Sequence, residues 1–529
     1  MKQHHFLRGA FVLSAAGIVI KLMGAVYRIP LARLIGGEGM GLYQMAYPVY
    51  TMILALSTSG IPVAISILVA KKEAQGDYAG GKRVFLVALL VLTLFGLLLA
   101  LLMFFASYWL AENVLHDTRA FLPLIAISPA LFITAVMSAF RGYFQGNQIM
   151  TPTAVSQILE QSVRVITVLV LAYLLMPYGI EFAAAGATFG AVTGSLAALL
   201  VLFAFYASFK DKKNTDTSIK QKDPIFLLIK WIAAIAIPLS LGGLVMPLMQ
   251  LVDAVLIPFR LQASGFSIAR ATELFGQFSG MANTLINLPA VITLSLAISL
   301  VPAISAVMVE KQMGQVRQRI ATAIRFAFII GIPASVGLWI LATPIAELLY
   351  DTPEVGISIA ILSPTALLLG LYQTTTAALH GIGKTYLPVK NLFIGVFIKG
   401  ILNYVLVGIP ALGIVGAGIA SITGFSVALL LNYLDVKKHT QIKLQWYKIL
   451  VVPVIAVSIM SFAVIGVYNF LEAFVGNNIA TLVAVLIGGA IYGLGILVLG
   501  GIKADDIKII PGIGTGLAGL LLRMRMIRK

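Results

Sequence analysis

The sequence predicts an all-α polytopic membrane protein with about fourteen transmembrane helices. Of its 529 residues, 60% are hydrophobic and only 11% are charged, and the mean hydropathy is +1.00. Apolar segments of about 20 residues, the length that crosses roughly 30 Å of bilayer hydrocarbon, recur from Phe6 almost to the end of the chain. This composition excludes a soluble globular chain.

The predicted spans follow one another with short gaps, and Gly and Pro interrupt several of them, as membrane helices tolerate. A polar linker at 210–224 is too short to fold alone, and the basic, partly amphipathic tail at 502–529 predicts an interfacial segment. The spans cover residues 7–34, 44–70, 83–110, 120–146, 152–176, 181–209, 225–256, 277–307, 318–344, 354–381, 385–409, 413–435, 447–470 and 478–500.

The orientation follows from the basic residues, because Lys and Arg concentrate in short cytoplasmic loops. With the N-terminus inside, twenty-nine of the 37 basic residues fall in inside loops and the two terminal segments. Only Arg33, Arg119, Arg260 and Arg270 fall outside. We therefore expect both termini to be cytoplasmic. The cytoplasmic loops then explain the net charge of +17, and no nucleic-acid partner is expected.

The chain also repeats itself at an offset of about 230 to 240 residues. Pro62 and Pro302 each precede a Lys by nine residues, RGYFQGNQIMTP resembles LHGIGKTYLP, and Gly194 matches Gly424. Residues 1–209 and 225–436 are therefore predicted to form two six-helix lobes, followed by helices thirteen and fourteen within 437–501. Six is an even number, so the lobes have the same orientation and are related by a pseudo-two-fold axis along the membrane normal, as in alternating-access transporters.

Four basic residues, Lys21, Arg28, Arg164 and Lys399, lie inside predicted spans. A charge near the bilayer centre costs at least about 2.5–3.5 kcal/mol, so such residues indicate a wet cavity, acidic partners or both. Lys21 and Arg28 are seven residues apart and share a helix face. Arg164 and Lys399 fall at near-equivalent places in the two halves, facing the gap between the lobes. This excess of positive charge favours a phosphate or carboxylate ligand.

Structural roles compete with ligand binding at these positions. Glu160 lies one turn before Arg164 and can neutralise it locally. Arg28 can extend its guanidinium to the outer interface.

Three further polar residues lie inside spans. Asp253 is the main buried acid, and it either binds a coupling cation or pairs with Arg28 or Lys21. Asn283 and Asn287 share a helix face, so they either line a polar cavity or form interhelical hydrogen bonds.

No catalytic or metal-binding motif is evident. The chain has no Cys and no converging set of Ser, His and Asp, and the run from Gly381 to Thr385 lacks the first glycine of a phosphate-binding loop, since Ala378 stands there. We expect no enzyme activity, no metal site and no cofactor other than a coupling cation. Transport would be driven by an ion gradient, the membrane potential or the cargo gradient.

Several stretches resemble the multidrug/oligosaccharidyl-lipid/polysaccharide exporter superfamily, and most closely its polysaccharide-transport branch, which includes stage V sporulation protein B and MurJ-like lipid II flippases. With length and helix number, the resemblance covers essentially the whole chain. The stretches are ARLIGGEGMGLYQMAYPVY from Ala32, GIPVAISILVAKKEAQGDY from Gly60, RGYFQGNQIMTPTAVSQILEQSVRV from Arg141 and ALHGIGKTYLPVKN from Ala378.

The resemblance implies a V-shaped pair of lobes in the bacterial cell membrane that moves undecaprenyl-pyrophosphate-linked sugars to the outer leaflet. Helices thirteen and fourteen resemble the pair that helps to form a groove for the lipid tail. Lys21 and Arg28 match positions whose basic residues bind the pyrophosphate in MurJ-like flippases. The chain departs from that pattern because no basic residue lies near Pro48 in helix two or Thr284 in helix eight.

Three functions follow as hypotheses. The first is a flippase for an undecaprenyl-pyrophosphate-linked cell-wall precursor, either lipid II or a related lipid-linked oligosaccharide. Its partners would be that anionic lipid, membrane lipids and cell-wall synthesis enzymes. The second is a cation-coupled multidrug exporter in which Asp253 is essential. The third is a non-transporting membrane scaffold for wall synthesis, in which the buried charges are dispensable.

Overall fold

The computed structural model describes residues 16–17, 19–58, 60–208 and 223–501, and every regular element in those ranges is a helix. The predicted tail and almost all of the predicted linker lie outside the described residues. The labelled helices before the linker are α2 (Arg28–Thr58), α3 (Ile61–Ala74), α4 (Tyr78–Asn113), η1 (Thr118–Ala120), α5 (Phe121–Ile127), α6 (Pro129–Gly146), α7 (Thr151–Leu175), η2 (Met176–Tyr178) and α8 (Ile180–Ser208).

The helices after the linker continue the same all-α pattern. The π-helix η3 (Gly276–Ala282) directly precedes the long helix α12 (Asn283–Val309). The other helices are α9 (Ile225–Gly243), α10 (Val245–Ala263), α11 (Ile268–Phe275), α13 (Met313–Ile340), α14 (Ala342–Tyr350), α15 (Val355–Leu362), α16 (Pro364–Gly381), α17 (Tyr386–Leu406), α18 (Ile414–Thr440) and α19 (Trp446–Val498).

The described residues contain twelve helical stretches long and apolar enough to cross a membrane, or thirteen if the bent pair α15–α16 forms one span. Two of them, Val19–Ala74 and Ile449–Val498, are 56 and 50 residues long. Each contains a glycine with positive φ, Gly36 at 65° and Gly476 at 76°, a conformation that glycine adopts without steric cost. These stretches agree with the predicted number of about fourteen when the bent pair α15–α16 is one span, the two long stretches are each divided at their glycine, and α9 and α10 are joined into one span.

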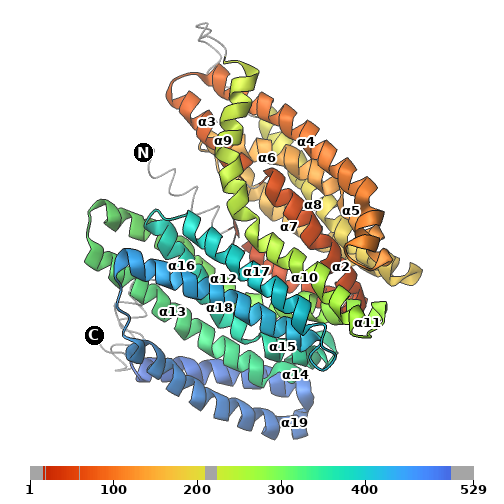
Figure 1. The fold of residues 1–529 in the computed structure, drawn as a ribbon, viewed down its shortest axis with the longest axis vertical. Helices are drawn as coiled ribbons and strands as arrows, with labels where there is room; N and C mark the ends of the chain where they lie inside the picture. Colours follow the sequence, from red (N-terminus) through yellow and green to blue (C-terminus); the bar gives the residue numbers. More distant parts are fainter. Residues whose placement is uncertain (1–15, 18, 59, 209–222, 502–529) are drawn as a thin grey trace. The chain divides into compact units, whose positions relative to one another are not determined.

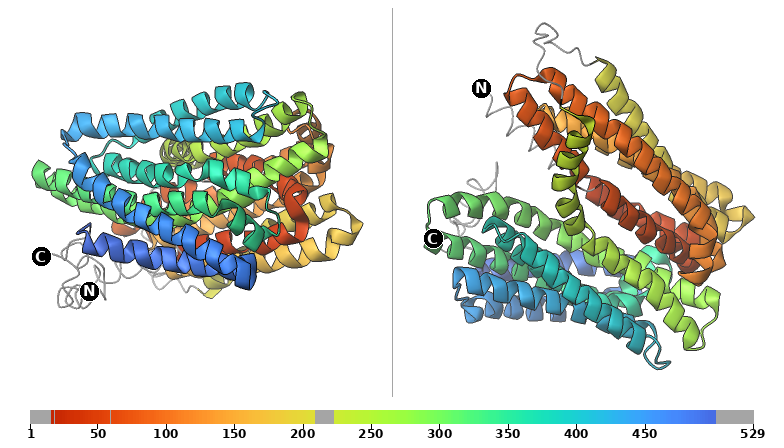
Figure 2. Two further views of the ribbon diagram at one scale, coloured as in Figure 1. Left: turned by 90° about the horizontal axis from the view of Figure 1, so that it is seen from below. Right: turned by 45° about the horizontal axis from the view of Figure 1, so that its top comes forward.

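α19 illustrates such a division. Its two arms lie side by side in Figures 1 and 2, where they are blue. A Cβ added at Gly495 would lie 3.3 Å from the Cβ of Ala456, and one at Gly488 would lie 2.5 Å from Val464. Small residues let the two arms approach closely. The arms correspond to predicted helices thirteen and fourteen.

Helix packing divides the chain into two compact units, each with its own apolar core. One unit comprises Met1–Met281 and Asn403–Ile414, and its main core packs α3, α4, α6, α8 and α9 around Phe85 and Phe140. The other comprises Ala282–Leu402 and Val415–Lys529, with a core built chiefly from α12, α13, α16 and α19. The predicted lobes of 1–209 and 225–436 were inferred from repetition rather than from packing, and they stay a prediction.

The repeat is visible in the local packing of each unit. In the first unit, a Cβ added at Gly142 of α6 would lie 2.8 Å from the Cβ of Ile65 on α3. In the second, a Cβ added at Gly381 of α16 would lie 2.7 Å from the Cβ of Ile304 on α12. These glycines are the ones that the aligned stretches RGYFQGNQIMTP and LHGIGKTYLP bring into register. In both halves, therefore, an isoleucine side chain packs directly against the glycine at the matching position of the partner helix.

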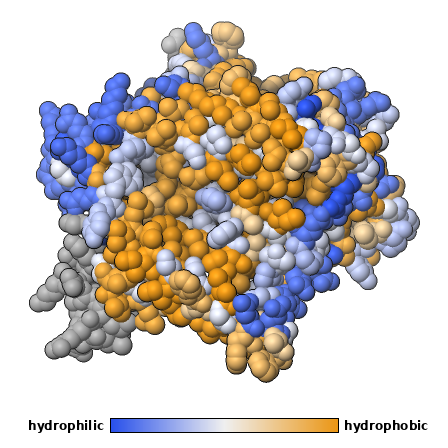
Figure 3. All heavy atoms as spheres, turned by 60° about the horizontal axis from the view of Figure 1, so that its bottom comes forward, coloured by the Kyte–Doolittle hydropathy of each residue, from blue (hydrophilic) through white to orange (hydrophobic). Residues whose placement is uncertain are grey.

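The surface carries the apolar area that a bilayer requires. On the face drawn in Figure 3, apolar residues form a wide area with hydrophilic residues gathered at its margins. Large hydrophobic side chains such as Phe105 on α4 and Phe462 on α19 are 77% and 80% exposed. Exposed apolar surface of this extent is unstable in water, and the chain is therefore a multi-pass membrane protein.

Candidate functional site: an arginine and tyrosine cluster

The first predicted basic pair lies where the described chain enters α2. Helical hydrogen bonds continue through this point, from Tyr27 N to Met23 O at 3.2 Å and from Leu31 N to Tyr27 O at 3.1 Å. Lys21 and Arg28 are therefore on one helix face, as predicted. Lys21 is exposed and Arg28 is half-buried.

A row of tyrosines on α2 accompanies Arg28. Tyr43, Tyr47 and Tyr50 are spaced so that they fall on one helix face, and the rings of Tyr43 and Tyr47 stack with centroids 5.6 Å apart. The guanidinium carbon of Arg28 lies 6.0 Å from the centroid of Tyr47, within the range of a cation–π contact. The hydroxyls of Tyr27 and Tyr43 are 2.9 Å apart and share a hydrogen bond.

Arg164 projects from α7 into an ion-pair group with a single acid. Arg164 Nη2 donates to Glu160 Oε1 at 2.6 Å, and Arg141 Nη2 from α6 donates to Glu160 Oε2 at 2.8 Å. The side chains of the two arginines are 14% exposed and that of Glu160 is 16% exposed. The local pair expected between Glu160 and Arg164 is present. However, one carboxylate serves two guanidinium groups, so positive charge remains.

The helix that carries Arg28 packs against the helix that carries Arg164. Tyr47 lies against Arg28, and its ring centroid is also 6.0 Å from that of Tyr50. A Cβ added at Gly24 would lie 3.5 Å from Gln161 Nε2, so the helix before Arg28 lies against α7. We call Arg28, Arg141, Arg164, Glu160 and the surrounding tyrosines 27, 43, 47 and 50 the arginine–tyrosine cluster.

The cluster has hydrogen-bond donors to spare. Arg28 Nε and Arg164 Nε are buried and have no hydrogen-bond partner among the described residues. A buried N–H without an acceptor is costly, and guanidinium groups match phosphate and carboxylate oxygens in charge and geometry. Three arginines against one acid therefore form a site suited to an anion.

Lys399 occupies the matching place in the second unit. It is 3% exposed on α17, and a Cβ added at Gly424 of α18 would lie 2.9 Å from its Cβ. Arg164 stands in the same relation to Gly194, at 3.0 Å. The near-equivalence of Arg164 and Lys399 predicted from the repeat is thus present in the packing. A role for Lys399 at the same ligand stays a prediction.

Asp253 has a partner that the sequence did not suggest. Asn403 Nδ2 of α17 donates to Asp253 Oδ1 of α10 at 2.9 Å, and both residues are buried. Asn403 Oδ1 is buried without a hydrogen-bond partner in the described part of the chain. The oxygens of both side chains are hard ligands of the kind that alkali and alkaline-earth cations prefer. The predicted roles of Asp253, in cation binding or in pairing with Arg28 or Lys21, stay predictions.

Asn283 and Asn287 pair within α12. Asn287 Nδ2 donates to Asn283 O at 2.7 Å and to Asn283 Oδ1 at 3.1 Å. Asn283 is half-buried and Asn287 is exposed. The described contacts are therefore within one helix, and cavity lining by these residues stays a prediction.

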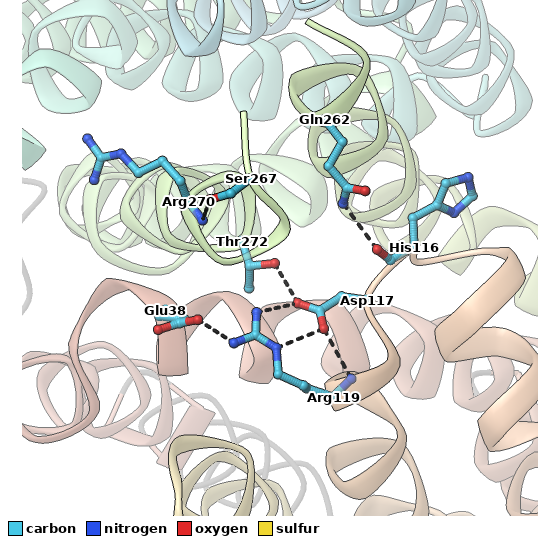
Figure 4. Close-up of polar contacts among 8 residues, drawn as sticks. All are labelled: Glu38, His116, Asp117, Arg119, Gln262, Ser267, Arg270 and Thr272. Atoms are coloured by element: carbon cyan, nitrogen blue, oxygen red, sulfur yellow. Dashed lines mark hydrogen bonds and ion pairs between the residues drawn. The ribbon is translucent and has the colours of Figure 1, made fainter. Parts of the chain in front are cut away.

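A second polar group, drawn in Figure 4, involves two of the predicted outside arginines. Arg119 pairs with Glu38 and, at 2.8 Å, with the buried Asp117, which also accepts a hydrogen bond from Thr272 Oγ1 at 2.7 Å. Arg270 pairs with Glu273 at 2.7 Å. Each of these cations has an acid of its own, so this group joins α2, η1 and α11 rather than offering charge to a ligand.

Sequence reasoning missed part of the arginine–tyrosine cluster. It did not single out Arg141, which lies in the predicted span 120–146 and bonds to Glu160 from α6. It also passed over the tyrosines, although the spacing of Tyr43, Tyr47 and Tyr50 on one face was available as a signal. Among the described residues, no group of three or more His, Asp and Glu side chains could hold a metal ion.

Comparison with known proteins confirms the predicted superfamily. Residues 6–308 match the family described as Polysaccharide biosynthesis protein, and residues 279–405 match the MatE family. The chain is 35% identical to stage V sporulation protein B of Bacillus subtilis (strain 168), over 97% of this chain and 99% of that protein. It is 29% identical to the lipid II flippase MurJ of the same organism, over 92% and 94%.

Solved structures confirm the predicted fold class. An inward-facing multidrug resistance transporter of the MATE family superposes with a TM-score of 0.67 at 19% identity, covering 82% of this chain and 98% of the other. Lipid II flippase MurJ in an inward closed conformation gives a TM-score of 0.66 at 17% identity, covering 92% and 98%. At these identities the similarity shows the fold and does not distinguish the cargo.

Proposed function

This chain belongs to the multidrug/oligosaccharidyl-lipid/polysaccharide exporter superfamily, and we propose that it is a flippase for an undecaprenyl-pyrophosphate-linked cell-wall precursor. The cargo is lipid II or a related lipid-linked oligosaccharide. It crosses from the inner to the outer leaflet of the bacterial cell membrane by alternating access, in a chain whose two termini are cytoplasmic. Cell-wall synthesis enzymes supply and consume this lipid.

The observation that carries the proposal is the unmatched charge of the arginine–tyrosine cluster. Arg28 Nε and Arg164 Nε lack acceptors among the described residues, and Glu160 is divided between Arg141 and Arg164. A diphosphate carries several acceptor oxygens and negative charge, so it can satisfy these donors with charge-assisted hydrogen bonds. A cationic cargo would instead be repelled by the same group.

The remaining predicted residues take supporting roles in this proposal. Lys21 lies on the same helix face as Arg28 and is exposed, so it can meet the diphosphate before Arg28 does. Lys399 adds positive potential from the equivalent place in the second half. Asn283 and Asn287 at the start of α12 offer amide groups to sugar hydroxyls.

Similarity to named relatives supports the class of cargo. The chain is similar over nearly its whole length to a protein named lipid II flippase and to a sporulation protein. One organism contains both relatives, and the chain is similar to each of them over nearly its whole length. Similarity therefore supports a lipid-linked precursor as the class of cargo, with lipid II as one member of that class.

The test is a flipping assay on full-length protein in liposomes that contain lipid II or an undecaprenyl-pyrophosphate-linked oligosaccharide. Arg28→Gln and Arg164→Gln should each slow flipping about tenfold or more, because each removes charge-assisted hydrogen bonds to the diphosphate. Arg28→Lys should retain part of the activity. Arg270→Gln is the matched control, because it removes one positive charge from an arginine that pairs with Glu273 outside the cluster.

Two results would contradict the site assignment. In the first, Arg28→Gln and Arg164→Gln insert, fold and flip at the rate of the unchanged protein. In the second, Arg270→Gln slows flipping as much as they do. Normal wall synthesis in cells with both cluster variants would favour the scaffold hypothesis.

A cation-coupled multidrug exporter is the second candidate, and the buried pair Asp253–Asn403 favours it. A carboxylate and an amide oxygen in the protein interior can hold a coupling cation, which would supply the driving force for export. Asp253→Asn should then abolish efflux of amphipathic cations, with Asp351→Asn at the end of α14 as a control. Efflux unchanged by Asp253→Asn would reject this candidate. Lipid flipping that depends on Asp253 and on a sodium or proton gradient would assign the pair to coupling in the flippase.

A further inference from the structure

The second unit contains a large open pocket whose described lining includes neither Lys399 nor the residues at the start of α12. Its volume is about 900 Å³, and its walls come from α13, from the segment between α18 and α19, from the start of α19 and from the residues just after its end. Gly500 and Gly501 close one side, where the chain leaves α19. No residue of the arginine–tyrosine cluster lines this pocket.

Three basic residues line the pocket, namely Arg317, Arg325 and Lys443, and no Asp or Glu is among its described lining residues. Arg317 and Arg325 are separated by eight residues on α13, so they lie on one helix face two turns apart. Arg317 Nε donates to Thr440 O at 2.7 Å, which fixes this side chain at the rim. The pocket is therefore a concentrated source of positive potential.

The same walls divide into a polar part and an apolar part. Neutral hydrogen-bonding side chains, Gln318, Thr322 and Gln441, accompany the cations, whereas Ile449, Val451 and Val452 line the pocket along α19. This combination matches an amphiphile, with its charged end at the arginines and its chains along the valines. A free inorganic anion would not need the apolar wall.

Aromatic residues indicate the level of the pocket relative to the bilayer. Tyr447 lines it, and the adjacent Trp446 and Tyr447 are 44% and 77% exposed. Exposed Trp and Tyr concentrate at membrane interfaces, where lipid headgroups lie. Arg317 and Lys443 fall in gaps predicted to be cytoplasmic, and Arg325 lies near the start of the predicted span 318–344 at the same end, so the lipid would come from the inner leaflet.

The repeat provides a contrast in the first unit. A smaller pocket of about 180 Å³ lies beside the ends of α3 and α4 and is lined by Lys71 and Lys72. Lys72 there pairs with Asp77 at 3.1 Å and also with Asp223. Lys72 beside the small pocket is thus paired with acids, whereas the described lining of the large pocket includes three basic residues and no Asp or Glu.

From this geometry we infer that the pocket between α13 and α19 binds the phosphodiester headgroup of an anionic phospholipid. Arg317, Arg325 and Lys443 hold the phosphate, and one acyl chain lies along Ile449, Val451 and Val452. Basic pockets between transmembrane helices are established sites for such headgroups. The bound lipid joins α13 to α19 and is distinct from the flipped cargo.

The test measures binding of tail-labelled phosphatidylglycerol to the purified full-length protein in neutral detergent, with phosphatidylcholine as the comparison lipid. Arg325→Gln and the double variant Arg317→Gln/Arg325→Gln should weaken phosphatidylglycerol binding about tenfold for each charge removed. Arg325→Lys should keep most of the affinity. Arg319→Gln is the matched control, since Arg319 lies on the same helix and donates to Ala303 O instead of lining the pocket.

Competition distinguishes a lipid from a free phosphate. Glycerophosphoglycerol and inorganic phosphate should compete only weakly, because neither contacts the apolar wall. The inference is overturned if the double variant binds phosphatidylglycerol as tightly as the unchanged protein, or if Arg319→Gln loses as much affinity. It is also overturned if inorganic phosphate displaces the lipid at equal concentration, or if phosphatidylcholine binds equally well. Since the readout is binding, failure here leaves the proposed flipping function intact.

Discussion

The helix pairs α7–α8 and α17–α18 pack in the same way but treat their buried cation differently. In each pair, a glycine of the second helix lies directly against the residue that carries the cation. A Cβ added at Gly194 would lie 3.0 Å from the Cβ of Arg164, and one added at Gly424 would lie 2.9 Å from the Cβ of Lys399. Close approach through small residues is the usual means of helix association in membranes.

The difference lies one turn before the cation. In α7 this position is Glu160, which pairs with Arg164 at 2.6 Å. In α17 it is Gly395, where an added Cβ would lie 2.5 Å from the carbonyl oxygen of Gly424 and 3.2 Å from the Cβ of Ala428. The second pair has no space there for an acidic side chain. The repeat thus retains the packing of the helices, whereas the compensation of charge is particular to each half.

The largest effect is expected from removing the acid of the first pair. Glu160→Gln leaves Arg141 and Arg164 without their shared carboxylate, and breaking a buried ion pair by removing one partner costs about 3–5 kcal/mol. Reversible unfolding in mixed detergent micelles, followed by tryptophan fluorescence, would measure the loss. Glu181→Gln on α8 is the control, with an expected change of about 0.5 kcal/mol or less. Equal stability of the two variants would show that Glu160 does not compensate the arginines.

A smaller effect is expected at the two glycine contacts. Gly194→Ala and Gly424→Ala each force a Cβ to within 3 Å of the facing helix, and overpacking of this kind costs about 1–3 kcal/mol. Gly466→Ala on α19 should be neutral or slightly stabilising, because an added Cβ there meets nothing within 4 Å. The same unfolding measurement applies. If either contact tolerates alanine as well as Gly466 does, the shared packing does not stabilise that half.

The smallest effect on stability is expected from removing one interhelical hydrogen bond that joins α7 to α8. Thr193 Oγ1 of α8 donates to Thr167 Oγ1 of α7 at 2.9 Å, whereas among the described residues the equivalent Thr423 donates to Ile419 O of its own helix, at 2.9 Å. Thr193→Val should cost about 0.6 kcal/mol, the average value of an interhelical hydrogen bond in membranes. Thr423→Val should cost less, and Thr167→Val should add nothing once Thr193 is Val. A loss at Thr423 equal to that at Thr193 would contradict this account.

Prediction from sequence succeeded where a signal lies within one helix. The length of the apolar segments identified the spans, and the interval of four residues between Glu160 and Arg164 identified their ion pair. It failed where the partner is distant along the chain. Asp253 bonds to Asn403, 150 residues away, and Glu160 also accepts from Arg141 on another helix. The spans on either side of Gly36 and of Gly476 were placed correctly as separate helices, because each glycine has a non-helical backbone conformation that ends one helix and begins the next.

The sequence by itself determined the membrane fold, the internal repeat and the presence of four cations within apolar segments. Those properties depend on hydropathy and spacing along one chain, and a bilayer imposes them regardless of how helices pack. Only the tertiary structure decided how each cation is accommodated. Whether an acid fits one turn before Arg164 or Lys399 on the same helix depends on the distance to the facing helix, and that distance is set by glycines and side chains remote in sequence. The arginine–tyrosine cluster and the pocket between α13 and α19 exist for the same reason, since their walls come from helices that only packing brings together.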